Sequence, residues 1–149
     1  MTNLEGKTVL ITGGSKGIGY GIAVRLLEQG ANVAITGRSE GAIRRAKEEL
    51  AKLEKGQVIG VVADVRNAGA QVRAVEEVVG KWGKLDVLVA NAGLGHFVAI
   101  DEMTPDQWNE TIDTNLTGAF YSVRAAIPEL KSSPSSAFSS AATFSTTAN

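Results

Sequence analysis

The sequence contains no cysteine and only one histidine. The missing thiols exclude disulfides, thiolate metal sites and a cysteine nucleophile, and they are typical of a protein from a reducing compartment. A single histidine, with no acidic cluster at ligand spacing, predicts no metal site. It also indicates no serine–histidine–aspartate catalytic arrangement.

An excess of charge and long hydrophobic runs are also missing. The 15 Lys and Arg residues are balanced by 16 Asp and Glu residues, so no net field favours nucleic acid or an acidic membrane surface. Residues 1–7 are polar, and no run approaches the roughly 18 apolar residues that a membrane span needs. We therefore expect a cytoplasmic protein with neither nucleic acid nor membrane as a partner.

What the chain does contain is a regular alternation of short apolar runs and amphipathic stretches. Its 149 residues, 44% of them hydrophobic, are enough to bury one sizeable core. Four apolar runs suit strands that are covered on both faces: 9–11, 33–35, 58–63 and 85–90. Strand–helix alternation predicts an α/β fold with a doubly wound parallel sheet, whose ligand lies at the carboxyl ends of the strands.

Helical patterns fill the intervals between these runs. A stripe over residues 18–27 predicts a helix that ends before Gly30, and Ser39 is the expected N-cap of a helix over about 40–53. A third helix is predicted over 68–82, and Thr104-Pro105-Asp106 predicts another helix start. The stripe after that start is made of Leu116, Phe120, Val123, Ile127 and Leu130, and ends near Lys131. Three aromatic residues are expected to serve in packing: Trp82, Phe97 and Trp108.

The regular pattern stops after residue 131. Residues 132–149 contain no charged residue, but they contain seven serines and three threonines. We expect this tail to form a weak fifth strand or to be disordered. The predicted doubly wound sheet is thus truncated after the fifth helix.

A glycine-rich turn joins the first predicted strand to the first predicted helix. It reads Thr12-Gly13-Gly14-Ser15-Lys16-Gly17-Ile18-Gly19. Glycine allows positive φ and a close approach of the backbone, while the free N–H groups at a helix start attract an anion. The turn predicts a dinucleotide phosphate site, and an ordinary strand–helix connection is the alternative. Its spacing is not the common Rossmann pattern.

Several motifs, in the right order, make the chain from about residue 7 to 131 similar to the amino-terminal part of a short-chain dehydrogenase/reductase. They are the glycine turn, Asp64 after the third strand, Asn91-Ala92-Gly93 after the fourth, and Asn115 in the following helix. The resemblance implies a Rossmann-type dinucleotide-binding domain over 1–131. It also implies hydride exchange between a nicotinamide cofactor and a small-molecule carbonyl or alcohol. Members of the family form dimers or tetramers through their fifth and sixth helices. This chain contains only the fifth, so a homo-oligomer is possible but its size is not predicted.

The resemblance also implies a preference for NADP(H) over NAD(H). Lys16 would face the 2′-phosphate of NADP, and its alternative is a solvated surface charge. NAD-preferring relatives carry an acid at the position of Gly37, where this chain has none. Arg38, one residue later, offers a planar fork suited to a phosphate.

The remaining matched residues receive roles from the same resemblance. Asp64 would reach the adenine amino group, unless it is only a helix cap. Asn91 would tie the strand ends together, and His96 either faces the substrate or is a generic loop residue. The predicted cofactor-binding set is Gly13, Ser15, Lys16, Gly17, Ile18, Gly19, Arg38, Asp64, Val65, Asn91, Ala92 and Gly93.

One departure from the family concerns catalysis. The family pairs tyrosine and lysine as Tyr-x-x-x-Lys, and neither Tyr20 nor Tyr121 has a lysine four residues later. The predicted catalytic residues are Asn115, which would hold a relay water, and Ser140, which resembles the family's catalytic serine. Two alternatives stay open: a non-catalytic dinucleotide-binding module, and a fragment that needs a partner chain.

Overall fold

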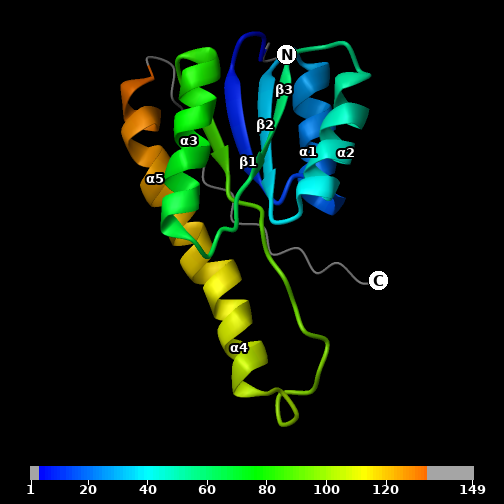
Figure 1. Cartoon of the computed structure of the whole chain (residues 1–149), viewed down its shortest axis with the longest axis vertical. Helices are drawn as coiled ribbons and strands as arrows, with labels where there is room; N and C mark the ends of the chain where they lie inside the picture. Colours follow the sequence, from blue (N-terminus) through cyan, green and yellow to red (C-terminus); the bar gives the residue numbers. More distant parts are fainter. Residues whose placement is uncertain (1–3, 134–149) are drawn as a thin grey trace.

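The computed structural model describes residues 4–133. In them the chain forms a parallel sheet with helices on both faces (Figure 1). The four strands have the order β3-β2-β1-β4, and they are β1 (Thr8–Thr12), β2 (Asn32–Gly37), β3 (Val58–Val62) and β4 (Val87–Val89). The predicted doubly wound α/β sheet is confirmed. Because every pairing is parallel, the carboxyl ends of the strands lie at one end of the sheet.

Two pairs of helices cover the sheet (Figure 1). α1 (Gly17–Glu28) and α2 (Glu40–Ala51) lie on one face, and α3 (Ala68–Trp82) and α5 (Gly118–Ser132) lie on the other. α4 (Pro105–Ile112) and the π-helical segment η1 (Asp113–Thr117) lead into α5 and extend beyond the sheet. Of the helices in residues 4–133, none has the length and apolar character to cross a membrane.

Local side-chain chemistry sets the helix boundaries. The Ser39 hydroxyl oxygen accepts a hydrogen bond from the Ala42 N–H at 3.3 Å, so the predicted N-cap of α2 is confirmed. Gly30 has a φ of 82°, the left-handed conformation expected just after the end of α1. Thr104 and Gln107 form a reciprocal capping box at the start of α4, where the sequence predicted a helix start.

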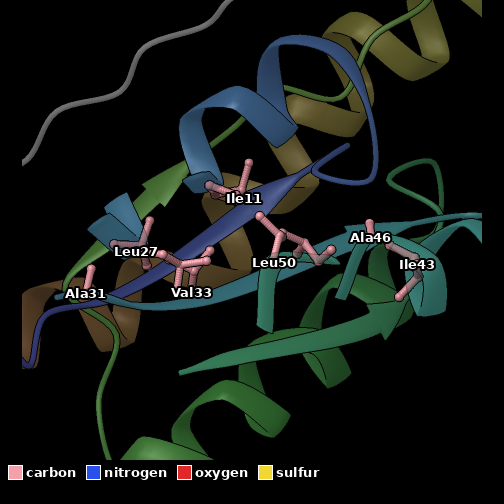
Figure 2. Close-up of a cluster of buried hydrophobic side chains, with 10 residues drawn as sticks. Ile11, Leu27, Ala31, Val33, Ile43, Ala46 and Leu50 are labelled. Atoms are coloured by element: carbon pink, nitrogen blue, oxygen red, sulfur yellow. The ribbon is translucent and has the colours of Figure 1, made fainter. Parts of the chain in front are cut away.

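Two hydrophobic clusters hold the strands in place. Between the sheet and helices α1 and α2 lie Val9, Ile11, Ala23, Leu27, Ala31, Val33, Ile35, Ile43, Ala46 and Leu50 (Figure 2). The opposite face is covered by Leu10, Ala34, Val75, Val78, Leu85, Leu88, Ala126 and Leu130. Each fully buried Val, Leu or Ile contributes roughly 1.5–3 kcal/mol. The clusters therefore fix the strand ends on which a site can be built.

A buried carboxylate ties together the other end of the sheet. Asp86 is 2% exposed; its carboxylate accepts hydrogen bonds from the Thr8 N–H at 2.8 Å and from the Ser133 hydroxyl at 2.6 Å. The Lys84 ammonium lies 2.9 Å from the same carboxylate. Burial raises the pKa of Asp86, but these donors outweigh it and hold the pKa at about 2. The contacts join β1, the start of β4 and the end of α5.

The predicted apolar stripe on α5 is wrong in its first half. Leu116 and Phe120 are 64% and 56% exposed, and the buried face of this helix is instead made of Gly118, Ser122, Ala126 and Leu130. A Cβ on Gly118 would lie 2.7 Å from a methyl group of Val65, so only a small residue fits there. The π-helical bonding of η1 also breaks the 3.6-residue period on which the stripe depended.

The predicted packing roles of two aromatic residues are also wrong. Trp108 and Phe97 are 51% and 70% exposed. Trp108 is exposed because α4 extends beyond the sheet and buries none of its residues, and Phe97 lies in the loop between β4 and α4. Trp82 does pack against the second cluster, as predicted. Residues 134–149, which make up nearly all of the predicted tail, lie outside the described residues.

Candidate functional site

A cleft of about 280 Å³ opens beside the carboxyl ends of the strands. It lies where the sequence predicted a ligand, next to the turn between β1 and α1. Its lining includes most of the predicted cofactor-binding residues: Gly13, Ser15, Lys16, Ile18, Arg38, Asp64, Val65, Asn91, Ala92 and Gly93. Gly17 and Gly19 do not line the cleft and act through the shape of the turn.

The glycine turn places backbone N–H groups at the cleft. Gly13 and Gly17 have φ values of 66° and 59°, which side chains rarely tolerate. A Cβ on Gly13 would lie 2.9 Å from the Ala92 Cα, so the turn touches the segment after β4. Lys16 is the N-cap of α1, its side chain makes no capping hydrogen bond, and no acid occupies the first turn. The helix start is therefore open to an anion.

Asn91 locks the turn against the end of β4. It is 4% exposed, and its Nδ2 donates to the carbonyl oxygens of Thr12 at 3.0 Å and Gly13 at 3.2 Å. The backbone N–H groups of Asn91 and Ala92 both donate to the Thr12 hydroxyl at 3.1 Å. A Cβ on Gly19 would lie 2.5 Å from the Asn91 Nδ2. Asn91 and Gly19 therefore set the shape of the turn together.

Two cations and one unsatisfied hydroxyl face the cleft. Lys16 and Arg38 both line it and both are exposed, and β2 ends before Arg38 with Gly37 rather than an acid. The Thr114 hydroxyl is buried at the cleft wall and has no hydrogen-bond partner within residues 4–133. A buried hydroxyl without a partner is costly, so a polar ligand group in the cleft would relieve it.

Asp64 lies at the cleft but does not cap α3. The N-cap of that helix is Asn67, whose Oδ1 accepts from the Ala70 N–H at 2.9 Å, so the capping alternative is wrong. The Asp64 carboxylate instead accepts from the Arg66 backbone N–H at 2.9 Å and from its guanidinium at 2.7 Å. The guanidinium lowers the pKa of Asp64.

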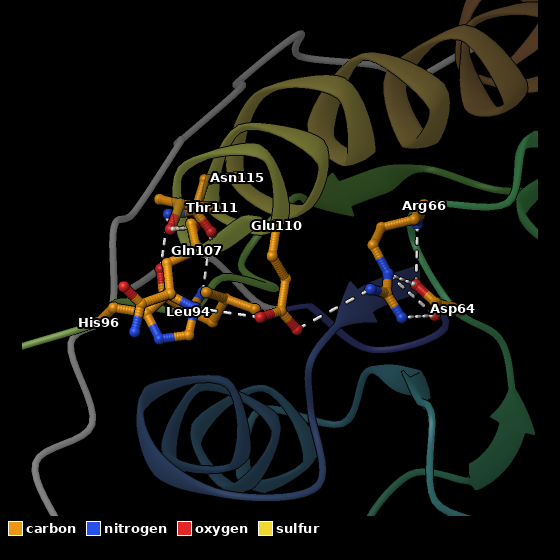
Figure 3. A network of polar contacts seen from close by, with 8 residues as sticks. All are labelled: Asp64, Arg66, Leu94, His96, Gln107, Glu110, Thr111 and Asn115. Atoms are coloured by element: carbon orange, nitrogen blue, oxygen red, sulfur yellow. Dashed lines mark hydrogen bonds and ion pairs between the residues drawn. The ribbon is translucent and has the colours of Figure 1, made fainter. Parts of the chain in front are cut away.

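Arg66 extends this pair into a network of polar contacts across the site (Figure 3). Its guanidinium lies 3.9 Å from the Glu110 carboxylate, and Glu110 lies 3.0 Å from the His96 Nε2. The sequence analysis missed Arg66 and Glu110. The contact of Arg66 could have been predicted, because Arg66 stands two residues after Asp64. Nothing local in the sequence connects Glu110 to Arg66 or to His96.

Asn115 holds the loop that follows β4 (Figure 3). Its Oδ1 accepts from the Leu94 N–H at 2.8 Å, and its Nδ2 donates to the Leu94 carbonyl oxygen at 2.7 Å. A Cβ on Gly93 would lie 3.1 Å from the same Oδ1, which explains the small residue there. Asn115 therefore supports the cleft wall from η1. The other predicted catalytic residue, Ser140, lies outside the described residues.

Across residues 4–133 there is no group of three His, Cys, Asp or Glu residues that could hold a metal ion. The site thus combines a polar cleft, a glycine-rich helix start, two exposed cations and an adjoining carboxylate. This combination suits a phosphate-bearing nucleotide.

Comparisons with known proteins agree with that geometry. The family described as short chain dehydrogenase matches residues 7–140. A D-beta-hydroxybutyrate dehydrogenase from Cupriavidus necator is 40% identical over 129 residues, which cover 86% of this chain and 49% of the relative. The chain spans about half the length of the curated relatives that it matches.

Solved structures give the same picture. A short chain dehydrogenase from Mycobacterium smegmatis has a TM-score of 0.82 and 38% identity, over 85% of this chain and 53% of that one. A 3-ketoacyl-(acyl-carrier-protein) reductase from Brucella melitensis, complexed with NADH, has a TM-score of 0.80 and 34% identity. The similarity covers 86% of this chain and 52% of the Brucella chain.

Proposed function

The chain belongs to the short-chain dehydrogenase family, and on that premise we propose that its domain over residues 1–131 binds NADP(H) for hydride exchange. The reaction partner would be the carbonyl or alcohol carbon of a small molecule. When bound, the cofactor supplies the hydride at nicotinamide C4. The chain's own residues bind and orient that cofactor. The observation that carries the proposal is the cleft, which Lys16 lines at the open start of α1 and Arg38 lines just after β2.

Each part of the cleft has a proposed task. The helix start after Gly13 would hold the pyrophosphate, and Asp64 would accept a hydrogen bond from the adenine amino group. Arg66 holds that carboxylate in its charged form, which preserves its ability to accept. The Thr114 hydroxyl offers a further unsatisfied polar group to the ligand. Asn115, through Leu94, would keep the nicotinamide side of the cleft in shape.

The choice of NADP(H) over NAD(H) rests on charge. The Brucella relative is a complex with NADH, so family membership alone does not distinguish the two cofactors. An additional phosphate on the ribose carries negative charge that Lys16 and Arg38 can neutralise. Arg38 can do so with two parallel N–H donors.

Replacing Arg38 by leucine should weaken NADPH binding at least tenfold and change NADH binding less than about twofold. The reason is that a hydrogen bond to a charged group contributes roughly 1.5–3 kcal/mol, and only NADPH carries the 2′-phosphate. Calorimetric titration with each cofactor measures the contrast. Arg44→Leu is the matched control, since Arg44 is exposed on α2 and does not line the cleft. Equal weakening of both cofactors would count against a phosphate contact.

A second candidate function is a dinucleotide-binding module without catalysis. It is favoured by one observation: neither Tyr20 nor Tyr121 has a lysine four residues later. Following NADPH absorbance with a panel of ketones separates the two candidates. An oxidoreductase consumes NADPH only when a carbonyl is added, whereas a binding module holds NADPH and consumes none.

A further inference from the structure

The outer edge of β3 carries backbone groups that point away from the sheet. In residues 4–133, β3 is an end strand that pairs only with β2. The Val33 N–H donates to the Gln57 carbonyl oxygen at 2.8 Å, and the Ala63 N–H donates to the Gly37 carbonyl oxygen at 2.9 Å. Odd-numbered residues of β3 therefore bond toward β2. Even-numbered residues direct their N–H and C=O groups outward: Val58, Gly60 and Val62.

A hollow rimmed by lysines lies beside this edge. It has a volume of about 350 Å³ and an apolar floor that includes Leu50 and Val58. Lys47 comes from α2, Lys55 from the turn before β3, and Lys81 from α3. Because α2 and α3 lie on opposite faces of the sheet (Figure 1), the cations approach the edge from both sides.

Within the described residues 4–133, these three lysines have no ion-pair partner. No acidic residue lines the hollow, and none of the three lysines takes part in the ion pairs found within residues 4–133. The lining of the hollow therefore carries three lysines and no acidic residue, although the chain as a whole has a net charge of −1. An unpaired strand edge is a ready template for another strand.

We propose that the β3 edge is a docking site for an extended, acidic segment of a partner protein. The segment would add a strand to the sheet, with backbone hydrogen bonds to the outward groups and carboxylates facing the lysines. Charge favours an acidic segment over a second copy of this chain as the occupant. Parallel pairing of two β3 edges would bring two sets of lysines together, and like charges opposite one another destabilise a strand pair. Antiparallel pairing would place the two sets at opposite ends of the strand pair, and sedimentation tests for such a dimer.

This site is separate from the proposed cofactor cleft. None of the three lysines lines that cleft, and the hollow lies by the amino-terminal end of β3, whereas the cleft lies by the carboxyl-terminal end. Substitution of these lysines therefore leaves the lining of the cleft unchanged. Cofactor binding then serves as an independent check that a variant is folded.

The probe is a fluorescein-labelled peptide of alternating glutamate and valine, about six residues long, the usual length of a strand. Its control carries lysine in place of glutamate. Fluorescence anisotropy at low ionic strength should detect binding of the acidic peptide and none of the basic one. Amide NMR shifts should concentrate at Val58, Gly60 and Val62. Equal binding of both peptides, or of neither, overturns the proposal, and the second result would mean that the lysines only keep the edge unpaired.

Two variants test the two kinds of contact. Lys47→Glu, Lys55→Glu and Lys81→Gln together should weaken acidic-peptide binding at least tenfold. Glutamine is used at Lys81 because that residue lies in the last turn of α3, where an acid would oppose the helix dipole. Arg124→Glu, at an exposed position in the middle of α5, is the matched control and should bind normally.

Val62→Pro tests the backbone contacts. Val62 is 52% exposed and its N–H points away from β2, so proline removes an outward donor without removing a bond of the sheet. The peptide should bind several-fold more weakly, while circular dichroism of the variant should match that of the wild type. Wild-type affinity in both this variant and the lysine variant would overturn the proposal. So would a dimer in sedimentation that the lysine substitutions strengthen, because the edge would then pair with a second copy.

Discussion

Replacing Asp86 by alanine is expected to lower the free energy of unfolding by about 3 kcal/mol, since the Thr8 N–H and the Ser133 hydroxyl lose a charged acceptor in a buried place. The same change removes the partner of Lys84. The contacts that join three segments at the amino-terminal end of the sheet would be lost: the start of β1, the start of β4 and the end of α5. Urea denaturation followed by circular dichroism measures the loss.

The pH dependence of stability gives the same prediction an independent test. The pKa of Asp86 is about 2 in the folded chain against an ordinary value of 3.8. A carboxylate with a lowered pKa stabilises the fold at pH values above its pKa in the unfolded chain. This stabilisation is lost as the pH falls toward its pKa in the folded chain. Roughly 2 kcal/mol of the free energy of unfolding should therefore be lost between pH 4 and pH 2. In Asp86→Ala this part of the acid dependence should be absent.

A matched control separates Asp86 from general effects of charge. Asp101 is exposed in the loop before α4, and Asp101→Ala should change the free energy of unfolding by less than about 0.5 kcal/mol. Asp64 also has a lowered pKa, so some acid dependence should persist in the Asp86 variant. A variant as stable as the wild type at neutral pH would mean that the buried contacts of Asp86 do not stabilise the fold.

Replacing Gly19 by alanine is expected to weaken dinucleotide binding roughly a hundredfold. The added Cβ would lie 2.5 Å from both the Gly13 carbonyl oxygen and the Asn91 Nδ2, two atoms that are hydrogen-bonded to each other at 3.2 Å. Overpacking of this kind costs about 1–3 kcal/mol, and the turn that holds the phosphates would move to relieve it. Titration calorimetry with NADPH measures the affinity.

Gly21→Ala provides the control in the same helix. A Cβ on Gly21 would meet nothing within 4 Å, and alanine is a better helix former than glycine by up to about 1 kcal/mol. This variant should bind NADPH normally and melt at a slightly higher temperature. If Gly19→Ala bound as tightly as Gly21→Ala, the close packing of Gly19 against Asn91 would not be needed for binding.

Much of the fold could be predicted because its signals are local. The helix predicted over 68–82 is confirmed at both ends, and the capping residues Ser39 and Thr104 act as predicted. Hydrophobic runs identified the strands because both faces of the sheet are covered. The predicted stripe through Leu116 and Phe120 was wrong. Periodicity shows only which residues are apolar, and it does not show which elements from elsewhere in the chain pack against them.

The residues of the candidate site also fall into two groups, those with a local signal in the sequence and those without one. Gly13, Asn91 and Asp64 were found because their motifs are continuous with strand ends, which the fold brings together. The contact of Glu110 with Arg66 and His96 was not found, because it depends on how far α4 extends past the sheet and on the course of the loop after β4. Neither feature has a short sequence signature.

Calorimetric titration of the folded 149-residue chain with NADPH and with NADH tests the central claim most directly. The account predicts heat of binding with NADPH, an affinity near micromolar (about −8 kcal/mol), and weaker binding of NADH. Circular dichroism on the same sample establishes that the chain is folded. Absence of heat and of thermal stabilisation with both cofactors, in folded protein, would contradict the claim that the cleft beside Gly13 and Arg38 is a dinucleotide site.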